Sequence, residues 1–103
     1  MRIEVLYFDG CPNRAPTVAL VKQIAVDLGL QIGVEEVNVT SIDDAQRLRF
    51  LGSPTVRVNG ADIDPAARDR THYALSCRVY PGVSGLPPDA LIRAALQASS
   101  ASA

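Results

Sequence analysis

The strongest constraint on the fold is a change of periodicity near the N-terminus. Residues 2–8, RIEVLYF, are rich in β-branched and aromatic residues and are followed by an Asp-Gly pair, which predicts a strand with apolar side chains on both faces. From Thr17 the apolar residues recur with helical spacing until Gly29, which supplies a stop. Residues 30–40 predict a second strand. Two strands joined by a helix form a right-handed parallel unit, so we expect an α/β protein.

A second strand-and-helix pattern follows. Ser41 with Asp44 three residues later resembles a capping box and predicts a short helix, which ends at Gly52. Residues 53–60, SPTVRVNG, predict a third strand that begins after a proline and ends at an Asn-Gly turn.

The last part of the chain completes the pattern. Residues 61–74 predict a polar loop, and residues 75–80, LSCRVY, predict a fourth strand antiparallel to the third. Pro88 fits the first turn of a final helix that extends to about Gln97. The expected order is β-α-β-α-β-β-α, with a four-stranded mixed sheet flanked by helices.

Length and composition limit the possible classes of protein. A chain of 103 residues, 48% hydrophobic and 20% charged, predicts one globular domain over 1–98 and a flexible tail over 99–103. The net charge of −1 and the lack of a basic patch argue against nucleic-acid partners. No apolar run reaches transmembrane length, and the N-terminus does not resemble a signal peptide. Two widely separated cysteines do not form a secreted disulfide framework, so we expect a cytoplasmic location.

Two short motifs carry a resemblance to a known family. They are DGCPN at 9–13 and GSPTV at 52–56. With the strand and helix order, they resemble the thioredoxin fold over roughly residues 3–98, and in particular small bacterial single-domain proteins with a D-G-C-P-N start. Some of those proteins are linked to mercury resistance and alkylmercury lyase. The resemblance implies a cis Ser53–Pro54 peptide bond that faces Cys11.

The resemblance also implies that Cys11 is a nucleophile, but Arg14 stands where dithiol members carry a second cysteine. Helix amides and the Arg14 cation would both favour the thiolate. Pro16 opposes this effect, because a helix that begins only at Pro16 lies farther from the thiol. Alternatively, Cys11 is a small apolar filler and Arg14 a solvated loop residue.

Substrate-binding residues follow from the same resemblance. Pro12, Ser53 and Thr55 would flank a partner bound beside the thiol. Gly82 and Gly85 lie in a turn similar to the one that holds glutathione in glutaredoxin-like proteins. An ordinary turn between a strand and a helix explains these two glycines equally well.

The remaining cysteine and the single histidine are less informative. In the predicted fourth strand Cys77 is buried near the middle, several residues from Cys11, so a direct disulfide would need loop movement. His72 lies in the polar loop and is expected at the surface. The spacing of Cys11, Cys77 and His72 is not that of a zinc site, so we predict no metal. We also predict no resident cofactor, with glutathione as a candidate co-substrate.

Three functions fit these features. The first is a monothiol thiol–disulfide oxidoreductase that acts on protein or small-molecule thiols and disulfides through Cys11 and Pro54. The second is a non-catalytic binding module for a peptide or for a thiophilic metal or organometal. The third is a redox sensor that uses Cys11 and Cys77. The sequence leaves open whether the protein is an enzyme, and it indicates no oligomeric state.

Overall fold

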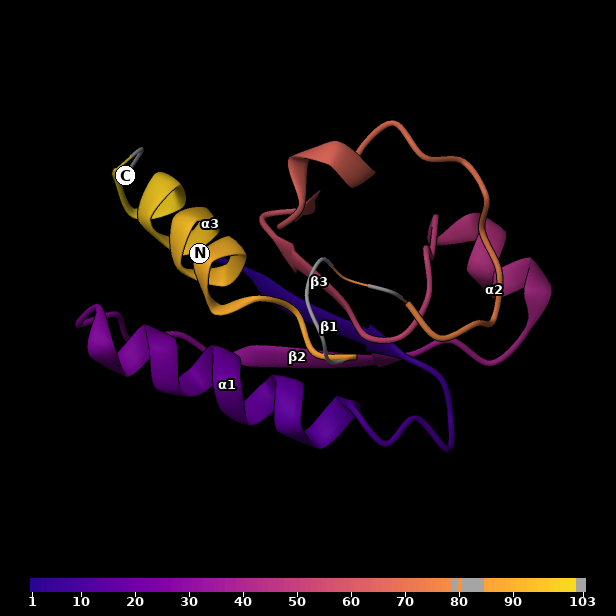
Figure 1. The fold of residues 1–103 in the computed structure, drawn as a ribbon, viewed down its shortest axis with the longest axis horizontal. Helices are drawn as coiled ribbons and strands as arrows, with labels where there is room; N and C mark the ends of the chain where they lie inside the picture. The colour runs from indigo at the N-terminus through magenta and orange to yellow at the C-terminus, as the bar shows by residue number, and fades with distance from the viewer. Residues whose placement is uncertain (79, 81–84, 102–103) are drawn as a thin grey trace.

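A computed structural model describes residues 1–78, 80 and 85–101 of the chain. Within these residues one mixed four-stranded sheet is combined with three α-helices (Figure 1). The predicted α/β class and the alternation of strands and helices are confirmed. The elements in chain order are β1 (Ile3–Tyr7), α1 (Arg14–Asp27), β2 (Val34–Asn38), α2 (Ile42–Arg47), β3 (Thr55–Val58), β4 (Ala61–Asp62), the 3-10 helix η1 (Pro65–Ala67) and α3 (Asp89–Ala101).

The order of strands in the sheet is β2-β1-β3-β4. β1 and β2 are parallel, with Ile3 opposite Val34, and α1 makes the connection between them. β3 is antiparallel to β1, with Leu6 opposite Thr55. β1 is therefore a central strand covered on both faces, as its apolar side chains predict.

The fourth strand lies earlier in the chain than the sequence predicts. Asn59 and Gly60 have φ angles of 52° and 84°, the positive values that a two-residue hairpin turn requires, and β4 begins at once after them. The predicted Asn-Gly turn is thus confirmed. A strand of two residues is too short to show an alternating pattern, so the Asn-Gly turn is its one signal in the sequence.

The prediction of a strand over 75–80 is wrong. Within this segment Cys77 forms an isolated parallel bridge with Ser53, at the residue before Pro54. β4 already occupies the edge of β3 that a further strand would need.

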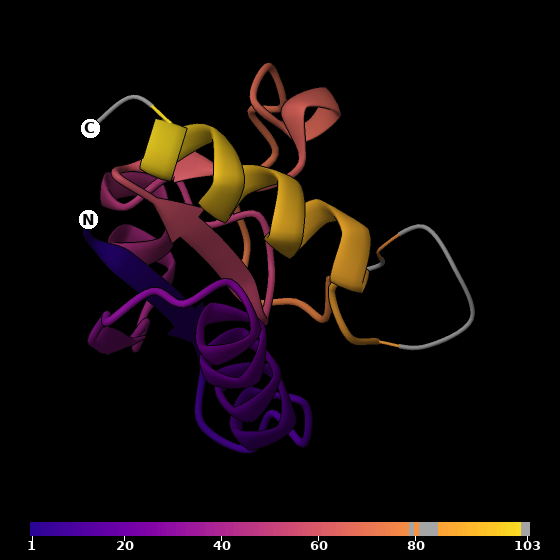
Figure 2. The same ribbon diagram turned by 90° about the vertical axis from the view of Figure 1, so that its left-hand side faces the viewer.

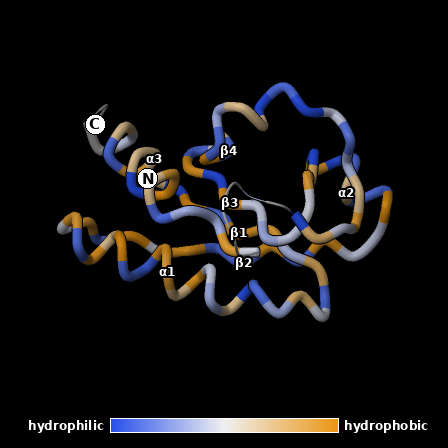
Figure 3. Tube along the Cα trace, viewed as in Figure 1, coloured by the Kyte–Doolittle hydropathy of each residue, from blue (hydrophilic) through white to orange (hydrophobic). Residues whose placement is uncertain are grey.

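Two apolar clusters stabilise the fold, one on each face of the sheet. α1 and α3 contact each other and cover one face (Figure 2). The hydropathy colouring in Figure 3 is mainly hydrophobic along β1 and hydrophilic in the loop that follows η1. The second cluster lies beneath α2 and contains Leu6, Val39, Ala45 and Phe50.

α1 begins earlier than predicted, at Arg14, with Asn13 at the N-cap. The amide of Thr17 donates to the carbonyl of Asn13 at 3.1 Å, so the first turn is helical despite Pro16. The first four amides of a helix have no intrahelical acceptor, so a proline in the first turn removes no hydrogen bond. The helix therefore starts three residues after Cys11.

α3 is longer than predicted. Leu91 donates its amide to the carbonyl of Pro88 at 3.1 Å, which is consistent with a helix start at this proline. The helix continues to Ala101, three residues into the segment predicted to be a tail. None of the described helices is long and apolar enough to cross a bilayer.

α2 begins and ends with recognisable capping motifs. The Ser41 hydroxyl accepts from the amide of Asp44 at 3.0 Å, which confirms the predicted cap. At the other end Phe50 donates to the carbonyl of Ala45 at 2.8 Å, and Arg49 donates to that of Gln46 at 3.2 Å. This is the Schellman arrangement, but arginine occupies the left-handed position, with φ of 54°, where glycine is usual.

Replacing Arg49 with glycine is expected to raise the free energy of unfolding by about 1 kcal/mol, because the left-handed conformation is costly for a residue with a Cβ. Urea denaturation measures the change. The matched control is Arg47→Gly, two residues earlier in the last turn of α2, which should lower stability by about 1 kcal/mol. A loss of stability in both variants would contradict this account of Arg49.

Candidate functional site

The candidate site is the edge of the sheet at which β1 ends and β3 begins. Because β3 runs antiparallel to β1 with Leu6 opposite Thr55, the segment after Tyr7 and the segment before Thr55 leave the sheet at the same edge. The first carries Cys11 and the second carries Ser53 and Pro54. The Ser53–Pro54 peptide bond is cis, as the resemblance implies.

Cys11 lies in a turn between β1 and α1. Its amide donates to the carbonyl of Phe8 at 3.2 Å, and Gly10 before it has a φ of 88°, which a residue with a Cβ rarely adopts. The side chain is half-buried and is a free thiol. Since α1 begins at Arg14, the unpaired amides of its first turn are close to the thiol in sequence.

Arg14 makes different contacts from those expected. Its guanidinium forms an ion pair with Glu36 of β2 at 3.3 Å and lies over the ring of Tyr7, 4.4 Å from the ring centre. Both partners come from the two parallel strands beside the start of α1. Arg14 thus contacts the sheet, whereas the sequence left two alternatives, a cation over Cys11 or a solvated loop residue.

Cys77 lies beside Ser53 and is exposed, which corrects the prediction of a buried residue in the middle of a strand. Ser53 donates its amide to the carbonyl of Ser76 at 2.8 Å, and its carbonyl accepts from the amide of Arg78 at 2.9 Å. Both backbone groups of Ser53 are therefore bound by the chain itself. The buried Ser53 hydroxyl has no hydrogen-bond partner among the described residues.

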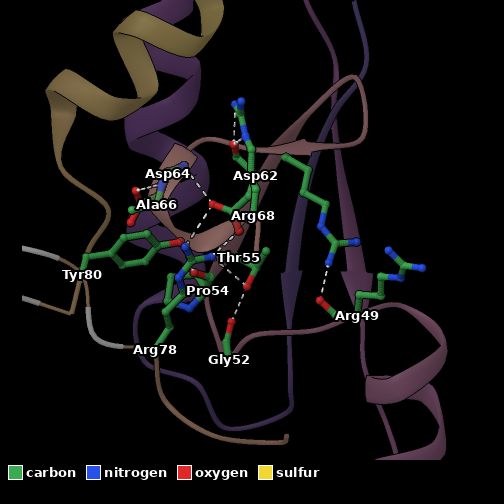
Figure 4. Close-up of polar contacts among 11 residues, drawn as sticks. Arg49, Gly52, Pro54, Thr55, Asp62, Asp64, Ala66, Arg68, Arg78 and Tyr80 are labelled. Atoms are coloured by element: carbon green, nitrogen blue, oxygen red, sulfur yellow. Dashed lines mark hydrogen bonds and ion pairs between the residues drawn. The ribbon is translucent and has the colours of Figure 1, made fainter. Parts of the chain in front are cut away.

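A buried ion pair fixes this arrangement, and no local pattern in the sequence predicts it. Both guanidinium amino groups of Arg78 bond to the carboxylate of Asp62, at 2.6 and 3.0 Å (Figure 4). The two side chains are 2% and 7% exposed. Burial is the largest single effect and opposes the charged form of Arg78, but the hydrogen bonds that Arg78 donates to Asp62 and the nearby negative charges together outweigh it, so the pKa of Arg78 is raised.

Three further hydrogen bonds involve the start of β3, and the first of them connects it to this pair. Arg78 donates to the Thr55 hydroxyl at 3.3 Å, and that hydroxyl donates to the carbonyl of Gly52 at 2.5 Å (Figure 4). Tyr80 donates its hydroxyl to the carbonyl of Pro54 at 2.6 Å. Burial raises the pKa of Tyr80, which keeps this phenol protonated as the donor. The hydroxyl of Thr55, a residue predicted to bind substrate, is therefore occupied by hydrogen bonds within the protein.

Two further residues predicted to bind substrate, Pro12 and Gly85, come from different segments of the chain. Pro12 is exposed in the turn after Cys11. Gly85 packs so closely against the Asn13 side-chain amide that a Cβ at Gly85 would collide with it. The segment before α3 thus touches the start of α1, near Cys11. Gly82 lies outside the described residues.

Within the described residues, no three histidine, cysteine or acidic side chains are grouped closely enough to hold a metal ion. His72 is exposed, as expected. No family model matches the sequence, and no match was found among curated proteins or solved structures.

Proposed function

We propose that the protein is a thioredoxin-like thiol–disulfide exchange protein in which Cys11 is the attacking thiol. The observation that supports this most directly is that Cys11 and the Ser53–Pro54 segment leave the sheet at one edge. The start of α1 three residues after Cys11 is a second support, because the amides of a first helical turn stabilise a nearby thiolate. The order of strands and helices is also compatible with the thioredoxin fold.

The chemistry requires one protein thiol and an external thiol such as glutathione. The Cys11 thiolate attacks one sulfur of a disulfide, forms a mixed disulfide and releases the other sulfur as a thiolate, which takes up a proton. An external thiolate then attacks the mixed disulfide, forms a new disulfide with the released group and restores the Cys11 thiolate. Each cycle consumes one external thiol: one half of the substrate disulfide leaves as a thiol, and the other half leaves as a disulfide with the external thiol. For a glutathione adduct and external glutathione, the products are the free substrate thiol and glutathione disulfide.

The backbone of Ser53 limits the kind of substrate. Its amide and carbonyl are both bound by residues 76 and 78, so an extended peptide could pair there only after this segment had moved. The buried ion pair of Arg78 opposes such movement. A small disulfide or a glutathione adduct, which needs no backbone pairing at Ser53, is therefore the favoured substrate class.

A redox sensor is the second candidate function, and one observation favours it. Cys77 is exposed and lies opposite Ser53, at the edge of the sheet that also carries Cys11. An oxidant such as diamide would take two electrons and two protons from the thiols as a Cys11–Cys77 disulfide forms. Intact mass after diamide treatment tests this directly, because an internal disulfide lowers the mass by two hydrogens.

The expected result for the exchange function is that Cys11→Ser reduces turnover of a glutathione mixed disulfide to the uncatalysed rate. Cys77→Ser should keep most of the activity, since the external thiol completes the cycle. The assay follows glutathione oxidation. Full activity of Cys11→Ser would exclude the proposal. Equal loss in both variants, with an internal disulfide in the wild type, would favour a dithiol mechanism instead.

A further inference from the structure

The nine arginines of the chain fall into two groups. Five form ion pairs with carboxylates. These five are Arg2, Arg14, Arg47, Arg78 and Arg93. No carboxylate of the described residues forms an ion pair with the other four, Arg49, Arg57, Arg68 and Arg70, and all four line a single cavity of about 210 Å³. Like charges gathered in a concave site repel one another, so such a site favours a bound anion.

Three segments of the fold bring these side chains together. Arg57 comes from β3, Arg49 from the turn after α2, and Arg68 and Arg70 from the segment after η1. Arg57 donates to the carbonyl of Arg49 at 2.7 Å. Arg68 donates through two nitrogens to the carbonyl of Asp62, at 3.0 and 2.9 Å (Figure 4). Backbone carbonyls thus position two of the guanidinium groups without neutralising them.

Two carboxylates at or beside the cavity, those of Asp62 and Glu4, are already engaged. Asp62 is the only acidic residue among those that line it, and both of its carboxylate oxygens are bound by Arg78. Glu4, the neighbour of Arg57 across the sheet, pairs with Arg2 at 2.9 Å. Burial lowers the pKa of Arg57, although Asp62 and Glu4 oppose this effect. The cavity therefore carries an excess of positive charge.

We propose that this cavity, the four-arginine cavity, binds a small phosphate monoester. The planar guanidinium fork matches the oxygens of a phosphoryl group, and several forks around one concave site suit its double negative charge. The volume is below that of most drug-sized sites, so the ligand is small.

The rest of the lining indicates what is attached to the phosphoryl group. Tyr73 supplies an aromatic ring, and Leu51, Ala61 and Ala67 supply apolar surface. An organic group of modest size, planar or apolar, would contact these side chains. Neither Cys11 nor Cys77 lines the cavity, so this site does not depend on the proposed thiol chemistry.

The test is a calorimetric titration of the full chain with phenyl phosphate at constant ionic strength. Arg49→Gln and Arg70→Gln are each expected to weaken binding about tenfold, since a charge-assisted hydrogen bond contributes on that scale. The matched control is Arg47→Gln, two residues from Arg49, which loses the same charge outside the cavity and should bind within about twofold of the wild type. Arg70→Lys, which keeps the charge and loses the fork, should bind less tightly than the wild type.

Several results would overturn the proposal. Equal weakening in Arg47→Gln and Arg49→Gln would mean that net charge, not the cavity, controls binding. A heat signal that chloride reproduces at the same ionic strength would mean simple ion screening. Tighter binding of an RNA oligonucleotide than of phenyl phosphate would replace the small ligand with a polymer. Circular dichroism of each variant confirms that folding is intact; Arg49 and Arg70 are exposed, so their glutamine variants should fold.

Discussion

Replacing Asp62 with alanine is expected to lower the free energy of unfolding by about 3–5 kcal/mol, a large part of the stability of a domain this size. The change leaves the Arg78 guanidinium, whose side chain is 2% exposed, without its counter-charge. It also removes the acceptor of the Asp64 amide, which now bonds to Asp62 at 2.9 Å. Guanidinium denaturation followed by circular dichroism measures this change in the free energy of unfolding.

Two comparisons separate the broken ion pair from other effects. Glu36→Ala breaks the half-exposed pair with Arg14 and should cost below about 1 kcal/mol, because solvent screens that pair. The double variant Asp62→Leu with Arg78→Met should regain much of the stability, since apolar residues can replace a buried pair. If Asp62→Ala costs no more than Glu36→Ala, Asp62 and Arg78 do not anchor the segment beside Ser53.

Local signals in the sequence predict those parts of the fold that depend on near neighbours. The Asn59-Gly60 turn, the Ser41 cap and the unit formed by the first two strands each depend on residues a few positions apart. The fourth strand was misplaced because the tertiary edge of β3, and not the composition of LSCRVY, decides which segment pairs there.

The sequence alone does not predict which side chains pair across the fold. Arg14 lies one helical turn from Cys11 in sequence, but the register of β1 and β2 places Glu36 within its reach. Asp62 and Arg78 show no pattern that connects them. The four-arginine cavity gathers residues from three separate segments in a chain whose net charge is −1, so an overall charge count conceals it.

The cluster beneath α2 depends mainly on one aromatic side chain. Phe50 is fully buried there with Leu6, Val39 and Ala45, and Ala45 is the only buried residue of α2 itself. The backbone of Phe50 also closes the end of α2 and accepts the amide of Ala74 at 3.2 Å. Phe50 therefore connects α2 to the sheet and to the segment that leads to Cys77.

Phe50→Ala is expected to lower the free energy of unfolding by about 3–5 kcal/mol, because Leu6, Val39 and Ala45 cannot fill the cavity left beneath so short a helix. Phe50→Leu should cost about half as much or less, since it retains most of the volume. Ile42→Ala, at a position of the same helix that is 64% exposed, serves as the control and should change stability by less than about 0.5 kcal/mol. Thermal and urea unfolding rank the three variants by their free energy of unfolding. An equal loss of stability in Phe50→Ala and Ile42→Ala would contradict this account. It would mean that this face of the sheet has no core of its own and that only the capping hydrogen bonds hold α2 in place.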